Sequence, residues 1–182
     1  MSNGVRVGRT LIQFSIGLFV LIIAISFGAT TKAATITVPV GGSLQAAINA
    51  AQAGDTIVLQ ADADYSCSCI LPNKAGSDYI VIKSSRYEEI PVRDFYSKTP
   101  SSDVVKLMPR LKSLYSTEPV FAAAPGSHHY KFLGLNLMPP AGQGTRILEL
   151  GVSGTAQDTL AEMPHDFVVD KSWLHADTTQ EM

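Results

Sequence analysis

Residues 43–60, SLQAAINAAQAGDTIVLQ, decide the fold, because they predict a short amphipathic helix followed at once by an apolar strand. Four apolar residues share the i, i+3, i+4, i+7 spacing of one helix face: Leu44, Ala47, Ile48 and Ala51. Ser43 is a suitable N-cap, and Gly54 suits the left-handed residue that ends a helix. So short a helix needs a surface to cover, and the strand at 56–59 is the nearest one. This order predicts the N-terminal cap of an exported β-solenoid.

The first 33 residues have the layout of a secretory signal peptide. Arg6 and Arg9 precede an apolar run over residues 11–29, and small residues then predict cleavage after Ala33. Because the apolar run is nearly long enough to span a bilayer, an uncleaved N-terminal anchor is the alternative. We therefore expect a secreted or periplasmic protein that has no membrane contact after cleavage.

Composition limits the remainder of the chain to one domain with few partner classes. Residues 34–182 carry 11 basic and 16 acidic residues, a formal net charge of −5, which argues against a nucleic-acid partner. Their number is enough for a single domain with a real core. The two cysteines, Cys67 and Cys69, lie two apart on an extended chain, where disulfide geometry is poor. We therefore expect no bond between them, and a lone C-x-C supplies too few ligands for a metal.

Short strand-like runs without long helices between them follow the predicted helix. Turn-rich segments separate these runs, which suits a sandwich, a barrel or a parallel solenoid. They cover residues 56–59, 79–83, 120–123, 130–137, 146–150 and 167–174. Residues 84–119 interrupt the pattern with many charges and four prolines, and we expect an excursion in which Ser101 or Ser102 caps a short helix.

Two of these runs favour the solenoid. A shift of 37 residues aligns 130–137 (YKFLGLNL) with 167–174 (FVVDKSWL). In both segments the apolar phase slips by one residue in the middle, whereas a strict strand keeps its period of two. Such a slip is expected at a corner between two short strands of stacked coils. The predicted fold class is therefore all-β, a parallel β-helix (solenoid) with a short N-terminal capping α-helix, and the resemblance described next implies that it is right-handed.

Several segments resemble the N-terminal part of bacterial right-handed parallel β-helix proteins of the pectin-lyase-like superfamily. They are TITVPVGGSLQAAINAAQAGDTIVLQ, LPNKAGSDYIVIKSS, APGSHHYKFLGLNL and PHDFVVDKSWLHADTTQEM. The resemblance covers residues 35–182 and implies a protein whose full-length relatives bind or cleave polysaccharide, as pectate lyases do. Their catalytic residues usually lie on later coils, so the resemblance implies a chain truncated at its C-terminus, a fragment without a complete catalytic site. An open end of this kind predicts self-association.

The alternative to a polysaccharide lyase or hydrolase is a non-catalytic surface, adhesive or structural β-solenoid. No G-x-S-x-G elbow, phosphate loop, dinucleotide fingerprint or H-E-x-x-H motif is present in the sequence, which excludes those enzyme classes. Whether the chain is an enzyme stays open at this point. A third hypothesis is that the chain is an inert truncated product.

The polar residues near the C-terminus are the best candidates for chemistry. Asp166, Asp170 and Asp177 offer carboxylate oxygens for calcium. Asp166, Asp170 and Lys171 are also the candidate catalytic residues, with Lys171 as the cationic group. The competing interpretation is a solvated corner at Asp170-Lys171. Trp173 is expected to face outward, where a sugar ring could stack on it.

Two adjacent histidines, His128 and His129, follow a predicted turn. Adjacent side chains on an extended strand face opposite sides, so we expect these two to be a poor metal-binding pair.

Overall fold

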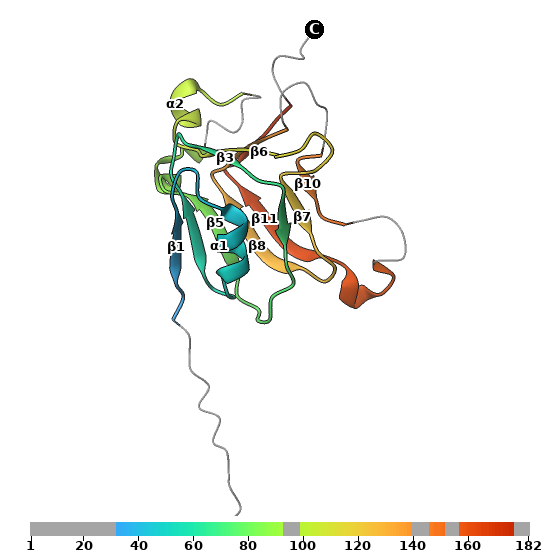
Figure 1. Cartoon of the computed structure of the whole chain (residues 1–182). Coiled ribbons are helices and arrows are strands. Elements are labelled where there is room, and N and C mark those ends of the chain that lie inside the picture. The colour runs from blue at the N-terminus through green and yellow to red at the C-terminus, as the bar shows by residue number, and fades with distance from the viewer. Residues whose placement is uncertain (1–31, 93–98, 140–145, 152–156, 177–182) are drawn as a thin grey trace, which may run out of the picture. The chain divides into compact units, whose positions relative to one another are not determined.

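The computed structural model describes residues 32–92, 99–139, 146–151 and 157–176 of the chain (Figure 1). The predicted signal peptide lies almost wholly outside these residues. Within them, no helix has the length and apolar character needed to cross a membrane. The strands are β1 (Thr35–Val38), β2 (Thr56–Leu59), β3 (Asp64–Ser66), β4 (Cys69–Leu71), β5 (Ile80–Ser84), β6 (Arg110–Lys112), β7 (Phe121–Ala123), β8 (His128–Leu133), β9 (Asn136–Met138), β10 (Leu148–Glu149), β11 (His165–Asp170) and β12 (Trp173–Leu174). The helices are α1 (Leu44–Ala50) and α2 (Ser102–Val105), with 3-10 turns η1 (Tyr87–Glu89) and η4 (Leu160–Glu162).

The strands form three sheets in which neighbours run parallel. Sheet A has the order β1-β2-β5-β8-β11, sheet B the order β12-β9-β6-β3, and sheet C the order β10-β7-β4. From β2 onward the chain visits A, B and C in a fixed rotation. Figure 1 shows sheet A as neighbouring strands that run from blue β1 to red β11.

The predicted fold class, an all-β right-handed parallel β-helix, is wrong. The described residues form a mixed α and β structure in which α1 and α2 lie between strands, and the three parallel sheets do not form a closed solenoid. Apolar periodicity shows which face of a strand is buried, but it does not show whether several sheets close into a solenoid. The parallel pairing could be inferred from the sequence, whereas the overall arrangement of the sheets could not.

The 37-residue alignment of two strand segments is confirmed by the pairing register. Phe167 is paired with Tyr130 and Val169 with Phe132 in sheet A, and Trp173 is paired with Asn136 in sheet B. The predicted corner lies between the two sheets.

The slip in apolar phase has a backbone cause. Gly134 and Lys171, which are 37 residues apart, both have a positive φ, of 65° and 44°. Each of these residues follows its strand of sheet A and turns the chain toward sheet B. A left-handed residue at the corner therefore shifts the alternation by one.

One apolar core lies between the three sheets. Its members include Ile57 and Phe132 from sheet A, Leu111 and Leu137 from sheet B, and Phe121 from sheet C, all fully buried. The rings of Phe121 and Phe132 lie 4.8 Å apart between centroids. The core therefore joins the sheets at both the first and the later strands.

The predicted N-terminal helix is confirmed as α1. The Ser43 hydroxyl accepts a hydrogen bond from the Ala46 N–H at 3.1 Å, and Ile48 is fully buried in the core that also contains Ile57 and Leu59. The helix ends at Ala50, before the predicted Gly54, which instead has a φ of 92° in the turn to β2. α1 packs against β1 and β4.

The interrupting segment 84–119 contains η1, α2 and β6. Ser101 caps α2 as expected, since its hydroxyl accepts from the Val104 N–H. Val104, Ile90 and Met108 form a second buried cluster, and the segment then returns to sheet B as β6 between β3 and β9. It is therefore an excursion for only part of its length.

The expectation for the cysteines is corrected. A disulfide joins Cys67 and Cys69, whose Cα atoms lie 5.1 Å apart, within the range that a disulfide spans. Both side chains are buried and point into the core, because the extended chain between β3 and β4 places alternate residues on one face. The sequence separation of two is therefore compatible with a bond here.

Candidate metal centre

Three of the chain's four histidines meet where β8 and β11 begin. His128 begins β8 and His165 begins β11, and the pairing register places the two directly opposite each other. Their rings stack, with centroids 5.0 Å apart and planes 10° apart. His129 follows His128 along β8, and Asp166 follows His165 along β11.

His129 and Asp166 share an unusual backbone. Both have a φ of 57°, in the left-handed backbone region that residues other than glycine rarely adopt. This conformation breaks the alternation of the strand, so the ring of His129 lies 4.8 Å from the ring of His128 and 6.0 Å from that of His165. The expectation that His128 and His129 face opposite sides is therefore wrong, because it assumed an extended backbone at both positions.

Ligand atoms of three of these side chains converge. The Oδ2 atom of Asp166 lies 2.8 Å from Nδ1 of His165 and 3.6 Å from Nε2 of His129. One ligand atom from each of the three residues lies within 4.8 Å of both others. Zn²⁺ with bonds of 2.0 to 2.1 Å in a tetrahedron holds its ligands about 3.3 to 3.4 Å apart. The two separations from Asp166 Oδ2, 2.8 Å to His165 and 3.6 Å to His129, lie on either side of that value.

The surroundings favour the charged form of the Asp166 carboxylate and the neutral form of the His128 imidazole. The hydrogen bond to His165 holds the pKa of Asp166 below its usual range, so this carboxylate is ionised at neutral pH. Burial, followed by the charges of His129 and His165, lowers the pKa of His128. The side chains of His165 and Asp166 are each about half exposed, at 53% and 50%, which leaves the cluster open to an ion in solution.

Tyr79 packs against one side of the histidine cluster. Its ring meets the ring of His129 edge-on at 5.1 Å, and the Lys131 ammonium lies 4.2 Å from the centre of the Tyr79 ring. Tyr79 immediately precedes β5, the neighbour of β8 in sheet A. His129 is therefore supported from the strand on the other side as well.

The predicted calcium set does not come together in the described residues. Asp166 lies near the start of β11 with two histidines, whereas Asp170 ends the strand and accepts a hydrogen bond from the Tyr87 hydroxyl at 2.5 Å. Asp177 lies outside the described residues. The nitrogen donors beside Asp166 suit a transition metal, whereas calcium prefers oxygen ligands.

The catalytic candidates Asp170 and Lys171 belong to a separate cluster with Tyr87. The Lys171 ammonium lies 4.8 Å from the centre of the Tyr87 ring. The hydrogen bond to Asp170, together with burial, raises the pKa of Tyr87 to about 12, so its hydroxyl keeps its proton. The Tyr87 hydroxyl is therefore already engaged with Asp170, and Lys171 lies over the Tyr87 ring.

Trp173, the candidate sugar platform, is only partly exposed. Its ring stacks on His175 with centroids 3.7 Å apart, and it packs against the buried cluster of Ile90 and Met108. His175 in turn is hydrogen-bonded through Nε2 to the buried Asn136, at 2.9 Å. Polysaccharide binding at Trp173 stays a prediction.

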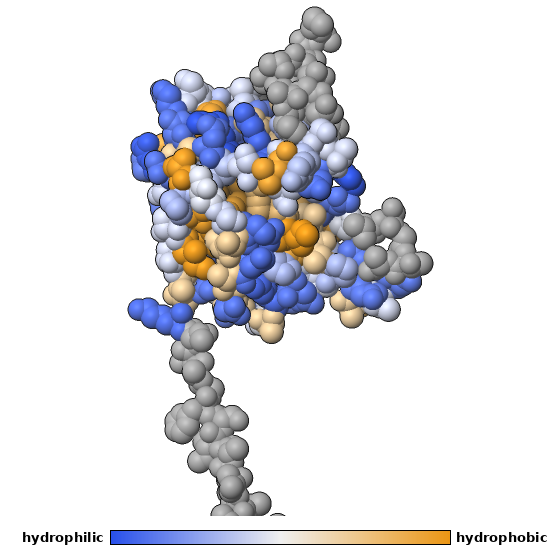
Figure 2. All heavy atoms as spheres, viewed as in Figure 1, coloured by the Kyte–Doolittle hydropathy of each residue, from blue (hydrophilic) through white to orange (hydrophobic). Residues whose placement is uncertain are grey.

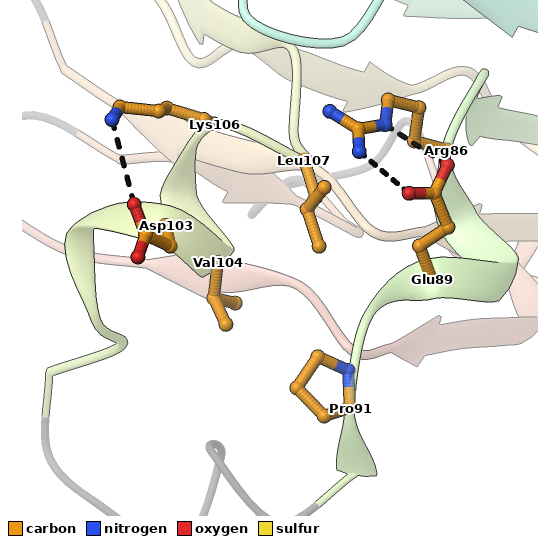
Figure 3. A pocket seen from close by; sticks show the side chains of 7 residues that line it. All are labelled: Arg86, Glu89, Pro91, Asp103, Val104, Lys106 and Leu107. Carbon is orange, nitrogen blue, oxygen red and sulfur yellow. Dashed lines mark hydrogen bonds and ion pairs between the residues drawn. The ribbon is translucent and has the colours of Figure 1, made fainter.

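A pocket of about 470 Å³ lies between η1 and α2, and its charges are already paired (Figure 3). Arg86 donates two hydrogen bonds to Glu89, at 2.9 and 2.5 Å, and Lys106 lies 3.5 Å from Asp103. In Figure 2, apolar side chains on the visible face form small groups among polar ones. The histidine cluster is therefore the stronger candidate site.

Comparison with known proteins gives no indication of what this site does. A scan against protein-family models gave no match, and neither the curated proteins nor the solved structures gave a significant one.

Proposed function

We propose that this chain binds a divalent transition-metal ion of the zinc type through His129, His165 and Asp166. The observation that supports the proposal is the convergence of one ligand atom from each side chain within 4.8 Å.

The donor set fits this class of ion. Two imidazole nitrogens and one carboxylate oxygen are typical of zinc and of other late first-row metals, and zinc sites with three protein ligands keep a position for water. On His129 the ligand atom is Nε2, which faces Asp166 Oδ2. Binding would open the 2.8 Å contact between Asp166 and His165 by about half an ångström.

The experiment is a titration of the purified, metal-free protein with Zn²⁺ and with Co²⁺. We expect one ion per chain by calorimetry, and a cobalt absorption spectrum of a site with fewer than six ligands. His129→Ala and His165→Ala should each abolish this binding. His175→Gln is the matched control, because His175 lies beside Trp173 and glutamine can still hydrogen-bond Asn136. Absence of binding by the wild type, or binding that both alanine variants retain, would overturn the proposal.

A further inference from the structure

We infer that His128 acts as a positioning residue for the proposed metal site, by accepting the Nδ1 proton of His129 so that the Nε2 lone pair of His129 faces the ion. The inference rests on the proposed function. It assigns to His128 a role outside the ligand set itself.

The contact that carries the inference joins the two Nδ1 atoms. They lie 2.6 Å apart, so one ring donates a proton and the other accepts it. A neutral imidazole carries its proton on one nitrogen only. When Nε2 of His129 binds a metal, the proton must be on Nδ1, and His128 Nδ1 is the acceptor within reach. Metal-binding histidines commonly donate their other N–H to such a partner, which fixes tautomer and ring orientation.

The ring of His128 is held in place for this task. It stacks on His165 with planes 10° apart and meets the ring of His129 at 84°. Pairing of His128 with His165 in the register of sheet A fixes the backbone beneath the stack. His128 thus contacts two proposed ligands at once, one through a hydrogen bond and one through a ring face.

The arrangement distinguishes His128 from a fourth ligand. The converging group consists of His129, His165 and Asp166, and Nδ1 of His128 is directed to His129 instead. Removal of His128 should therefore weaken metal binding and leave one ion per chain.

The test compares three substitutions in the full chain, with Zn²⁺ affinity measured by competition with a chelating dye. His128→Phe keeps a ring for the stack and removes the acceptor, and we expect affinity to fall 10-fold to 100-fold. His128→Asn places a carbonyl oxygen near the position of Nδ1, and we expect it to recover most of that loss. His128→Gln places its oxygen one bond further out and should recover less.

A second readout observes the tautomer directly. In nitrogen-15 spectra of the zinc-loaded wild type, we expect His129 to be protonated at Nδ1 and metal-bound at Nε2. Metal bound through Nδ1 of His129 would overturn the inference, even if His128→Phe failed to fold. Equal affinities of wild type and His128→Phe would also overturn it while leaving the proposed function intact. A wild type that binds no metal would contradict both.

Discussion

β8 and β11 are two versions of the same strand with different surroundings. They pair in parallel at an offset of 37 residues and share left-handed positions within the strand and at the corner after it. Yet Phe132 in β8 is fully buried, whereas its partner in β11, Val169, is 42% exposed. β8 lies between β5 and β11 in sheet A, and β11 pairs with β8 alone among the described strands.

The difference shows how a repeated backbone produces a site. Equivalent positions of parallel neighbours stack in columns about 4.8 Å apart. At the start of the two strands, His128 is paired with His165, and His129 lies beside Asp166. Several possible metal-ligand atoms are therefore close together at this end. At the other end Leu133 is paired with Asp170, and that carboxylate is satisfied by a tyrosine from η1 instead.

The largest expected effect tests the difference in burial. Phe132→Ala should lower the free energy of unfolding by about 3 to 5 kcal/mol, because it leaves a cavity against Phe121 in the core. Val169→Ala, at the equivalent position, should cost less than about 1 kcal/mol. Urea denaturation of both variants measures this. Similar losses for the two would mean that β11 is as deeply packed as β8.

The next effect concerns the two carboxylates of β11. Asp166→Asn should weaken Zn²⁺ binding by about 10-fold or more, since loss of an outer partner alone costs 10-fold to 100-fold. Asp170→Asn is the matched control and should leave metal affinity unchanged, because Asp170 contacts Tyr87 rather than a histidine. Calorimetric titration separates the two. Equal weakening by both variants would argue for a site that extends along the strand.

A smaller effect tests the shared corner. Gly134→Ala should destabilise the protein by about 1 to 2 kcal/mol, because alanine is strained at a φ of 65°. The new Cβ would also lie 2.5 Å from Ile90 Cδ1, so that side chain must move. Lys171→Ala should cost less, because the left-handed strain at this position is already present in the wild type. Thermal unfolding compares the pair, and a larger loss for Lys171→Ala would contradict the equivalence of the two corners.

The sequence predicted the local parts of this fold better than its overall class. Helix α1 and strand β2 follow from the apolar spacing of residues 43–60, and the offset of 37 residues follows from two short segments. Strands β3 and β6 were missed because each has three residues with one inward side chain, Tyr65 and Leu111, which is too short a pattern to detect. How the three sheets join depends on contacts between residues far apart in the sequence.

The histidine cluster could not be predicted from the strand pattern, for a reason that concerns one dihedral angle. A strand period of two places His128 and His129 on opposite faces, and only the left-handed φ of His129 brings them together. A signal was nevertheless present. Extending the 37-residue alignment two residues toward the N-terminus places His128 on His165 and His129 on Asp166.

The smallest effect tests whether the Tyr87 and Asp170 cluster stabilises the corner end of β11. The pKa of Tyr87 is raised to about 12, above its ordinary value near 10, so the folded state holds this proton more tightly than the unfolded chain. The resulting stabilisation is present below pH 10 and is lost as the pH rises from 10 to 12. Tyr87→Phe lacks the hydrogen bond and should be less stable than wild type by up to about 1 kcal/mol at pH 7 to 9.

The difference between wild type and Tyr87→Phe should shrink above pH 10, when measured by urea denaturation at several pH values. Tyr115→Phe serves as the control for loss of a tyrosine hydroxyl elsewhere, because Tyr115 is 60% exposed. A Tyr87→Phe difference that grows with pH would mean that the ionised tyrosine is the stabilising form. In that case the Asp170 carboxylate could not be the hydrogen-bond acceptor of the Tyr87 hydroxyl, and the two ends of β11 would not differ in the way described above.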